Sequence, residues 1–357
     1  MKNTFGNNVS ITLFGESHGE MIGAVIDGLA PGTVIDREMI EKKLTQRRPS
    51  GKISTARVER DAYSIVSGEL EGRATGAPLC ILIPNENKRS SDYGTLARPG
   101  HADLTAEYKY GGYQDRRGGG HFSGRLTAPI VAAGAIMLSE LNKKGIYIGT
   151  HIASLADIED RGFSDVVSDI KYLDTTDFPT LDANIGEKMK SEIEAAASEG
   201  DSVGGVLETY VYGVPTGLGE PWFDSVESLI SHAMFSIPGI KGVEFGAGFG
   251  ISKMRGSEAN DPIYSEGRKI RTETNNAGGI NGGITNGMPI VFRCAVRPTP
   301  SIFKSQRTVD IKTGENAVLD LKGRHDPAII HRARAVVDCL TAIVIYDLLA
   351  GGKKEKR

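Results

Sequence analysis

The sequence predicts an α+β fold in which helices and antiparallel sheets form one domain. Strand-like runs follow one another without intervening helices, and such runs favour antiparallel pairing. No fixed-period repeat and no Pro- or Ser-rich linker divides the 357 residues into independent units. Glycine is frequent, at 45 residues where an average chain of this length has roughly 25. Many backbone positions must therefore need a positive φ or a close approach.

The elements of the first half follow from hydrophobic periodicity and capping residues. Asp36 is the expected N-cap of a helix that runs into an arginine pair, and Ser123 is expected to cap a long apolar helix that Gly145 ends. The glycine-rich stretch at 111–124 cannot be regular. In chain order the pattern predicts strands at 9–13 and 24–26, a helix at 36–48, strands at 58–67 and 77–84, helices at 101–110 and 127–144, and a strand at 146–153.

The second half again combines predicted strands and helices, after a polar, weakly patterned stretch at 155–180. That stretch and a charged helix at 182–199 indicate a peripheral insertion over 155–200 in a single domain spanning 1–350, and 351–357 should be a disordered tail. The remaining predicted elements are strands at 206–215, 241–249 and 289–296 and helices at 225–237 and 327–349.

Charge and cysteine content exclude several classes of protein. With 42 Lys and Arg against 45 Asp and Glu, the formal net charge is -3, which excludes a basic nucleic-acid coat protein. The cysteines at 80, 294 and 339 form no CxxC pair, so neither a disulfide framework nor a zinc ribbon is expected. The N-terminal residues have only a four-residue apolar stretch, so we expect no leader there, and no segment has the roughly 18 uninterrupted apolar residues of a membrane span. We therefore expect a soluble cytoplasmic protein.

Histidine and arginine cluster in irregular segments. The histidines in question are His18, His101, His121 and His325, and histidine can move protons near neutral pH. Arginine forks and glycine-rich backbone both bind carboxylate and phosphate, so the pattern favours a polyanionic small molecule. Solvated histidines and ion-paired surface arginines remain open alternatives, the latter above all at Arg116 and Arg332. The arginines beside such breaks are Arg47, Arg48, Arg98, Arg116, Arg117, Arg125, Arg297, Arg324 and Arg332.

Familiar motifs of other enzyme classes are missing from the sequence. There is no GxxxxGK[ST], GxGxxG or HExxH, which argues against P-loop, dinucleotide-binding and zincin proteins. No cluster of Cys and His has the spacing of a metal site. The segment YGGYQDRRGGGHFSGR superficially matches RGG-type RNA-binding tracts, but it is a single copy in an acidic chain.

A set of motifs resembles the chorismate synthase family over nearly the whole chain. In order they are GESHG at 15–19, RRPSG at 47–51, RPGHAD at 98–103, GGGHFSGR at 118–125, GVPTGLGEP at 213–221, KGVEFGAGF at 241–249, NNAGGINGG at 275–283, RPTPS at 297–301 and GRHDP at 323–327. The resemblance implies a layered α+β homotetramer. It also implies a reaction that uses reduced FMN without net oxidation, the anti-1,4-elimination of phosphate from 5-enolpyruvylshikimate 3-phosphate.

The resemblance also implies roles for residues at matching positions. His18 would manage the protonation of the flavin, His101 would face the departing phosphate, and Asp326 would assist removal of the ring proton. The implied substrate-binding residues are Arg47, Lys52, Arg98, Arg125 and Arg324. The implied FMN-binding residues are His121, Phe122, Ser123, Pro238, Gly239, Gly282, Arg297, Pro298, Thr299, Pro300, Ser301 and Arg324.

The sequence departs from the family pattern at a few of these positions. His121 and Leu126 replace an arginine and a glutamate, RPTPS replaces the commoner KPTSS, and Asp338 stands where glutamate is more common. Fungal members of the family reduce their own flavin with NADPH. Because no reductase domain or dinucleotide fingerprint occurs here, we expect an external source of reduced flavin. The alternative function is a flavin reductase or another FMN enzyme acting on a polyanion.

Overall fold

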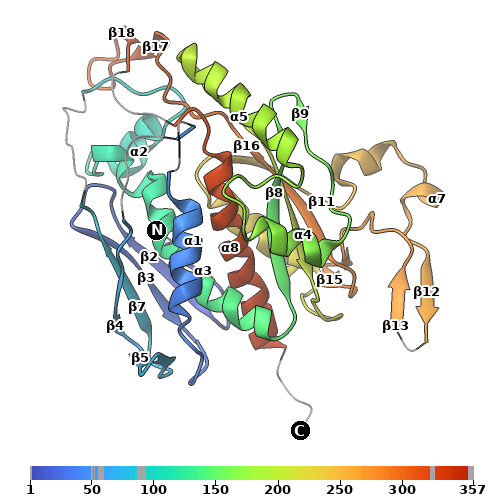
Figure 1. Ribbon diagram of the computed structural model, residues 1–357. Coiled ribbons are helices and arrows are strands. Elements are labelled where there is room, and N and C mark those ends of the chain that lie inside the picture. The colour runs from blue at the N-terminus through green and yellow to red at the C-terminus, as the bar shows by residue number, and fades with distance from the viewer. Residues whose placement is uncertain are drawn as a thin grey trace.

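Two antiparallel sheets of five strands each lie on either side of long central helices, which confirms the predicted α+β class (Figure 1). The computed structural model describes residues 2–49, 51, 53–54, 60–86, 94–267, 269–321 and 326–352. Sheet I has the order β1 (Thr4–Phe5), β2 (Ser10–Gly15), β3 (Met21–Asp27), β7 (Leu79–Pro84), β4 (Ser64–Ser67). Sheet II has the order β11 (Ile240–Phe245), β16 (Ile290–Val296), β10 (Gly205–Tyr212), β8 (Tyr147–Leu155), β9 (Ile158–Glu159).

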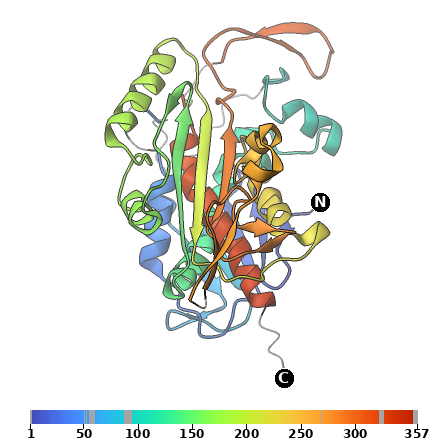
Figure 2. The ribbon, with the colours of Figure 1, turned by 90° about the vertical axis from the view of Figure 1, so that its right-hand side faces the viewer.

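The helices between the sheets form two layers. Helix α3 (Thr127–Lys143) lies against β3 and β7 of sheet I, α1 (Arg37–Arg47) packs on α3 and α8, and α8 (Ile330–Gly351) lies against β8 and β10 of sheet II. Helix α3 packs along α8, and Figure 2 shows sheet II in front of α8. The other helices are α2 (Asp103–Tyr110), α4 (Val166–Leu173), α5 (Ala183–Ser198), α6 (Val226–Phe235) and α7 (Gly256–Ala259).

Alternation along the strands explains why each sheet has one buried face. In β3 the side chains of Ile22, Ala24 and Ile26 point to the helices and are fully buried, since alternate residues of a strand share a face. Helix α3 is buried nearly all round because it lies between sheet I and α8. By length and hydropathy the segment Gly124–Lys143 could cross a membrane, but 89% of it is buried inside the protein, as in the core helix of a soluble protein.

The α3–α8 contact depends on glycine at position 134. A Cβ atom added to Gly134 would lie 2.4 Å from the carbonyl oxygen of Cys339 on α8, which is closer than any real contact. Glycine therefore lets the two helix backbones approach, and this approach brings the N-terminal ends of both helices to one end of the molecule.

Several predicted boundaries are confirmed and others differ. The Asp36 side chain caps α1 by accepting a hydrogen bond from the Met39 N–H, and α3 ends just before Gly145. Ser123 instead accepts from the N–H of Arg125, in a 3₁₀ turn that precedes α3. Strand β4 covers only the end of the predicted 58–67 strand, and α8 begins three residues after Pro327.

Helix α4 and several hairpins were not predicted. Helix α4 is short and lies in the polar 155–180 stretch, where its apolar face, including Ile170, packs on Gly149 of β8. The single domain with a 155–200 insertion stays a prediction, and residues 353–357 of the predicted tail lie outside the described residues.

The small hairpins are β5 (Glu69–Leu70) with β6 (Arg73–Ala74), β12 (Ile263–Glu266) with β13 (Lys269–Thr272), β14 (Ile280–Asn281) with β15 (Ile284–Thr285), and β17 (Gln306–Val309) with β18 (Asn316–Leu319). The 3₁₀ helices are η1 (Arg117–Phe122), η2 (Gly124–Leu126), η3 (Trp222–Asp224) and η4 (Gly248–Lys253).

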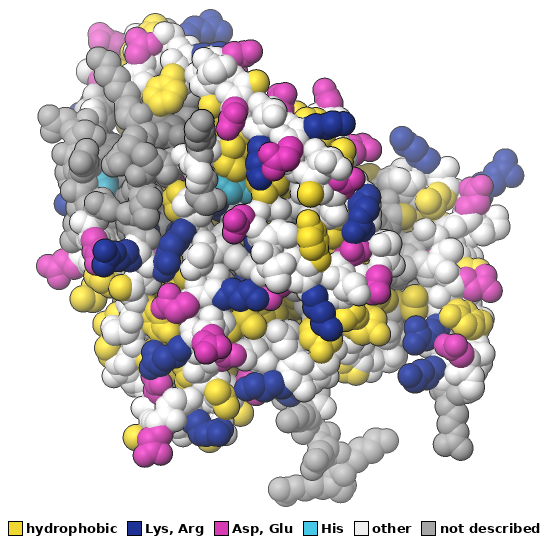
Figure 3. All heavy atoms as spheres, in the orientation of Figure 1, with side chains coloured by type: hydrophobic (Ala, Val, Ile, Leu, Met, Phe, Trp, Pro, Cys, Tyr) yellow, Lys and Arg dark blue, Asp and Glu magenta, His cyan; other side chains and the backbone are white. Residues whose placement is uncertain are grey.

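The surface carries both signs of charge intermingled. On the face shown in Figure 3, Lys and Arg side chains lie among Asp and Glu side chains and do not merge into one basic patch.

Candidate active site

A cavity of about 310 Å³ lies between the C-terminal end of α1, η2, the residues that follow α6, and the N-terminal end of α8. This volume is at the lower end of the range for small-molecule sites. One part of its wall carries arginines and carboxylates, and another part is apolar. The lining residues are Arg47, Pro49, Asp61, Ser123, Gly124, Arg125, Thr127, Ile237, Pro238, Asp326, Ile329, Arg332, Ala333 and Val336.

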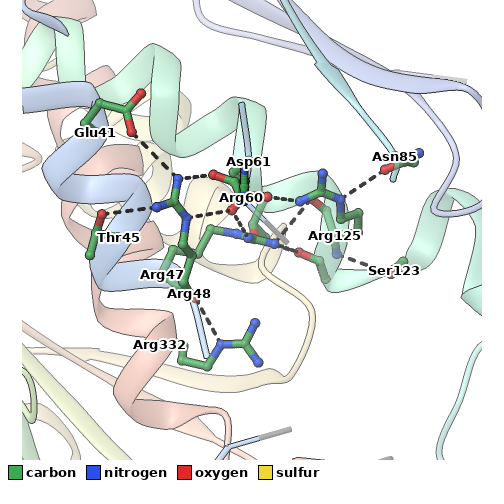
Figure 4. A network of polar contacts seen from close by, with 12 residues as sticks. Glu41, Thr45, Arg47, Arg48, Arg60, Asp61, Asn85, Ser123, Arg125 and Arg332 are labelled. Atoms are coloured by element: carbon green, nitrogen blue, oxygen red, sulfur yellow. Dashed lines mark hydrogen bonds and ion pairs between the residues drawn. The ribbon is translucent and has the colours of Figure 1, made fainter. Parts of the chain in front are cut away.

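The arginines from the RRPSG and GGGHFSGR motifs meet at one carboxylate in this wall (Figure 4). Asp61 lies between them: Nη1 of Arg47 donates to its Oδ2 at 3.1 Å, and Nη1 of Arg125 donates to its Oδ1. All three side chains are at least 90% buried. Arg48 approaches the same carboxylate, with its Nε 3.9 Å from Oδ2. The structure thus brings two predicted anion-binding arginines together in a buried position.

Asn85 connects Arg125 to the GESHG turn. The turn joins β2 to β3, and Asn85 follows β7, the neighbouring strand of sheet I. The Asn85 side-chain amide donates to the carbonyl oxygens of Glu16 and Gly19, each at 3.0 Å, and its oxygen accepts from Nε of Arg125 at 3.0 Å. Because Asn85 is 5% exposed, this link holds the turn and the arginine in a fixed relation.

The GESHG turn packs directly on the glycine-rich segment that contains His121. The N–H of Ser17 donates to the Gly120 carbonyl at 3.1 Å, and Nδ1 of His121 donates to the Gly15 carbonyl at 2.8 Å. His18 is buried under this segment. A Cβ atom on Gly118, where φ is +60°, would lie 2.8 Å from Cε1 of the His18 ring, so glycine is needed for the segment to cover the ring.

His101 belongs to a second cluster that reaches the cavity through the loop after α6. Its Nε2 lies 2.8 Å from the Ser301 hydroxyl, and Arg297 donates to the carbonyl oxygen of Gly100. The backbone N–H of Arg297 donates to the carbonyl of Gly239 at 3.0 Å, next to Pro238 in the cavity wall. The structure therefore joins the RPGHAD and RPTPS motifs. The rest of the RPTPS motif, Pro298, Thr299 and Pro300, lies in the loop that follows β16.

Asp326 lines the cavity and pairs with an arginine. Nη1 of Arg332 donates to Oδ2 of Asp326 at 2.8 Å, and Nε of Arg332 donates to the carbonyl oxygen of Arg47 at 3.0 Å. The alternative interpretation of Arg332 as an ion-paired cation is thus confirmed, although the pair faces the cavity. Arg116 is likewise paired, with Glu107.

Other predicted residues lie outside the cavity wall. Arg98 forms a bidentate ion pair with Asp103, in which Nε donates to Oδ2 at 2.8 Å and Nη2 donates to Oδ1 at 2.7 Å. Phe122 lies against Tyr110, with ring centroids 6.1 Å apart. Gly282 lies in the β14–β15 turn, beside the N-terminal end of α6, whereas Pro238 follows its C-terminal end. The predicted residues Lys52 and Arg324 lie outside the described residues.

Sequence reasoning missed several residues of the cavity wall. Asp61 lies in the wall, and Asn85, which is outside the wall, accepts a hydrogen bond from Arg125; neither stands in any of the motifs, and only their positions in space reveal them. The apolar wall is made by Ile237, which follows α6, by Ile329, which precedes α8, and by Ala333 and Val336 on α8, and none of these was singled out from the sequence. Among the described residues, no group of three or more His, Cys, Asp or Glu side chains is placed to hold a metal ion.

The cavity combines buried arginines with an apolar wall, an arrangement that suits an anionic small molecule and is typical of an enzyme site. Comparison with known proteins makes this class specific. The family model for chorismate synthase matches residues 9–350. Chorismate synthase of Dehalococcoides mccartyi is 46% identical over 354 residues, which cover 98% of this chain and 96% of the relative. That of Thermococcus kodakarensis is 43% identical over 347 residues, covering 96% of each.

A solved structure agrees with the sequence relatives. A crystal structure of chorismate synthase matches with a TM-score of 0.77 and 28% identity, covering 98% of this chain and 94% of that one. The chain belongs to the chorismate synthase family. Its activity is that of a phosphate-eliminating lyase of the shikimate pathway, which leads to the aromatic amino acids, and the family requires reduced FMN.

Proposed function

We propose that the cavity beside Asp61 holds 5-enolpyruvylshikimate 3-phosphate, and that Arg47 and Arg125 bind one of its anionic groups. The observation that carries this proposal is the convergence of two buried guanidinium groups in one cavity. The substrate carries two carboxylates and a phosphate, and arginine binds such groups through paired N–H donors. Arg98, Lys52 and Arg324 are proposed to complete the set of cations.

The residues of the cavity fit FMN as well as an anion. The apolar wall of Ile237, Pro238, Ile329 and Val336 suits a flat aromatic ring, and a Cβ atom on Gly124 would meet nothing within 4 Å, so backbone there can approach a ligand closely. Held against this wall, reduced flavin would supply electron density that helps the C–O bond to phosphate break, with no net oxidation. We assign the flavin contacts to the predicted FMN-binding residues, of which Ser123 and Pro238 line the cavity and Gly282 does not.

We propose distinct roles for the two histidines and Asp326. His18, covered by the glycine-rich segment, is suited to hold a proton out of reach of bulk water. His101, oriented by the Ser301 hydroxyl, is suited to donate a proton to the departing phosphate. Asp326 faces the cavity with its orientation set by Arg332, and assists removal of the ring proton. The C–H electrons form a new ring double bond, the existing ring double bond shifts to the carbon that bears the phosphate, and phosphate leaves with the electrons of the C–O bond.

The finer properties of the enzyme are also proposals. We infer a homotetramer, as the family resemblance implies, and a cytoplasmic location, as the cysteine content favours. We also infer an external source of reduced flavin, because the given sequence has neither a reductase domain nor a dinucleotide fingerprint. NADPH is therefore not expected to be a substrate. The domain spans 1–350, as the family match over residues 9–350 supports.

The decisive test is an anaerobic assay with reduced FMN and 5-enolpyruvylshikimate 3-phosphate, in which the absorbance of chorismate is followed. His18→Ala and His101→Ala should each slow turnover by roughly 10² to 10⁴, the usual contribution of a positioned proton donor, without loss of folding. Near-normal turnover in both variants would remove the histidines from the mechanism. A flavin reductase would instead oxidise NADPH and leave the phosphate substrate unchanged.

A further inference from the structure

Asp61 has an unusual combination of backbone and side-chain features. Its φ of +52° is in the left-handed region that residues other than glycine rarely adopt, although aspartate tolerates it better than most. The residue is 3% exposed, and its carboxylate lies between Arg47 and Arg125 with Arg48 nearby. This placement must be maintained by the attraction of the guanidinium groups, because the backbone alone does not favour it.

The two arginines do not depend on Asp61 for their orientation. Nε of Arg47 donates to the Thr127 hydroxyl at 2.8 Å and its Nη2 donates to the Gly124 carbonyl at 3.1 Å. Nε of Arg125 donates to Asn85 at 3.0 Å and its Nη2 donates to the Pro84 carbonyl at 3.2 Å. In each arginine it is Nη1 that turns to Asp61. Movement of the carboxylate would therefore leave both guanidinium groups in place with their Nη1 atoms directed at the same point.

We propose that Asp61 is an anionic placeholder: its carboxylate occupies the position that an anionic group of the substrate takes between Arg47 and Arg125, and the substrate displaces it. This inference rests on the proposed function of the cavity. Two buried cations this close need a counter-charge, and a carboxylate and a phosphate present similar acceptor oxygens to the same donors. Both anions cannot share the position, because like charges repel.

The placeholder has two consequences for the reaction. It lowers the apparent affinity for anions, because binding must first move Asp61 away from the arginines. It also favours release, because the returning carboxylate competes with product phosphate for the same donors. Replacing Asp61 by a neutral residue should therefore strengthen anion binding, whereas removing a carboxylate that merely orients the arginines should weaken it.

The test compares the binding of inorganic phosphate to the wild-type protein and to two variants by titration calorimetry. Asp61→Asn keeps the shape and removes the charge, and Asp61→Gly also removes the unfavourable backbone conformation. Each variant is expected to bind phosphate about tenfold more tightly or better. The matched control is Asp169→Asn, which neutralises a carboxylate held by both Nη atoms of Arg161, at 2.6 and 3.1 Å, away from the cavity wall. It should bind phosphate as the wild type does.

Unchanged or weaker phosphate binding in the folded Asp61 variants would overturn the proposal. Hydrogen exchange of the wild-type protein provides a second measurement that needs no variant: phosphate should raise the exchange of amides around Asp61, and protection there would overturn the placeholder. Arg125→Ala distinguishes failure of the proposed substrate site from failure of the placeholder. If this variant makes chorismate with an unchanged KM, the proposed substrate site is wrong. If it loses phosphate binding while the Asp61 variants gain none, only the placeholder is wrong.

Discussion

Lys43 and Asp338 form a buried ion pair between α1 and α8, and Lys43→Met tests how strongly it holds the two helices together. Nζ of Lys43 lies 3.0 Å from Oδ2 of Asp338 and 3.3 Å from Oδ1 of Asp174. The exposed fraction of Lys43 is 3% and that of Asp338 is 2%. Burial by itself lowers the pKa of Lys43, but the two carboxylates outweigh it and the pKa is raised, so the amine is charged at neutral pH.

The expected loss follows from what Lys43→Met leaves behind. Methionine replaces much of the apolar stem but leaves Asp338 buried without its cation, which costs about 3–5 kcal/mol of the free energy of unfolding. With an unfolding entropy of about 2.1 cal/mol/K per residue, 357 residues give about 0.75 kcal/mol per kelvin. The melting temperature should therefore fall by about 4–7 °C.

Calorimetry and denaturant titration of the single and double variants check this reasoning. Lys43→Met combined with Asp338→Leu should regain most of the loss, because an apolar pair can replace a buried ion pair at little cost. Lys304→Met serves as the control, since Lys304 forms an exposed pair with Asp201 and its loss should change stability by less than about 1 kcal/mol. A loss below about 1 kcal/mol in Lys43→Met would refute the argument.

Four further outcomes are expected. Gly134→Ala should lower the free energy of unfolding by about 1–3 kcal/mol, because its Cβ would meet the Cys339 carbonyl, and an unchanged denaturation midpoint would contradict this. Burial alone lowers the pKa of His151, but two hydrogen-bonded carboxylates outweigh it and raise the pKa. Its contribution to stability is thus complete below pH of about 6.5 and is lost as pH rises through the folded pKa. Stability curves of His151→Gln should lack this loss, and a curve parallel to the wild type would count against it. Arg125→Ala should weaken substrate binding by roughly 10- to 150-fold and Arg125→Lys should restore it only partly, whereas full rescue would indicate a simple charge field. Asp326→Asn should bind FMN and substrate but lose most turnover, while EDTA leaves the wild type unaffected; wild-type turnover in the variant together with EDTA sensitivity would show that its role is wrong.

The sequence predicted the elements that have a regular hydrophobic period. Alternation at 24–26 and a strand-like apolar run at 77–84 identified strands of sheet I, and the long apolar run after Ser123 identified the central helix α3. These patterns are local, because each residue's neighbours in the chain decide which face is buried. Helix α4 was not predicted because it is short and lies in a polar stretch. Its apolar face is buried by packing on β8, and the local pattern of residues does not reveal this contact.

The sequence also determined which loops contain the chemistry, since glycine-rich breaks with arginine and histidine are visible without a structure. Motifs over 47–51 and 118–125 named two arginines of the cavity wall. Only the tertiary structure decided what lies between those arginines. Asp61 and Asn85 belong to no such motif, and their importance arises from distance and burial, which depend on how sheet I, α1 and α3 pack together. Electrostatic interactions weaken with the distance between the charges and strengthen on burial. Neither that distance nor that burial can be read from the order of residues along the chain.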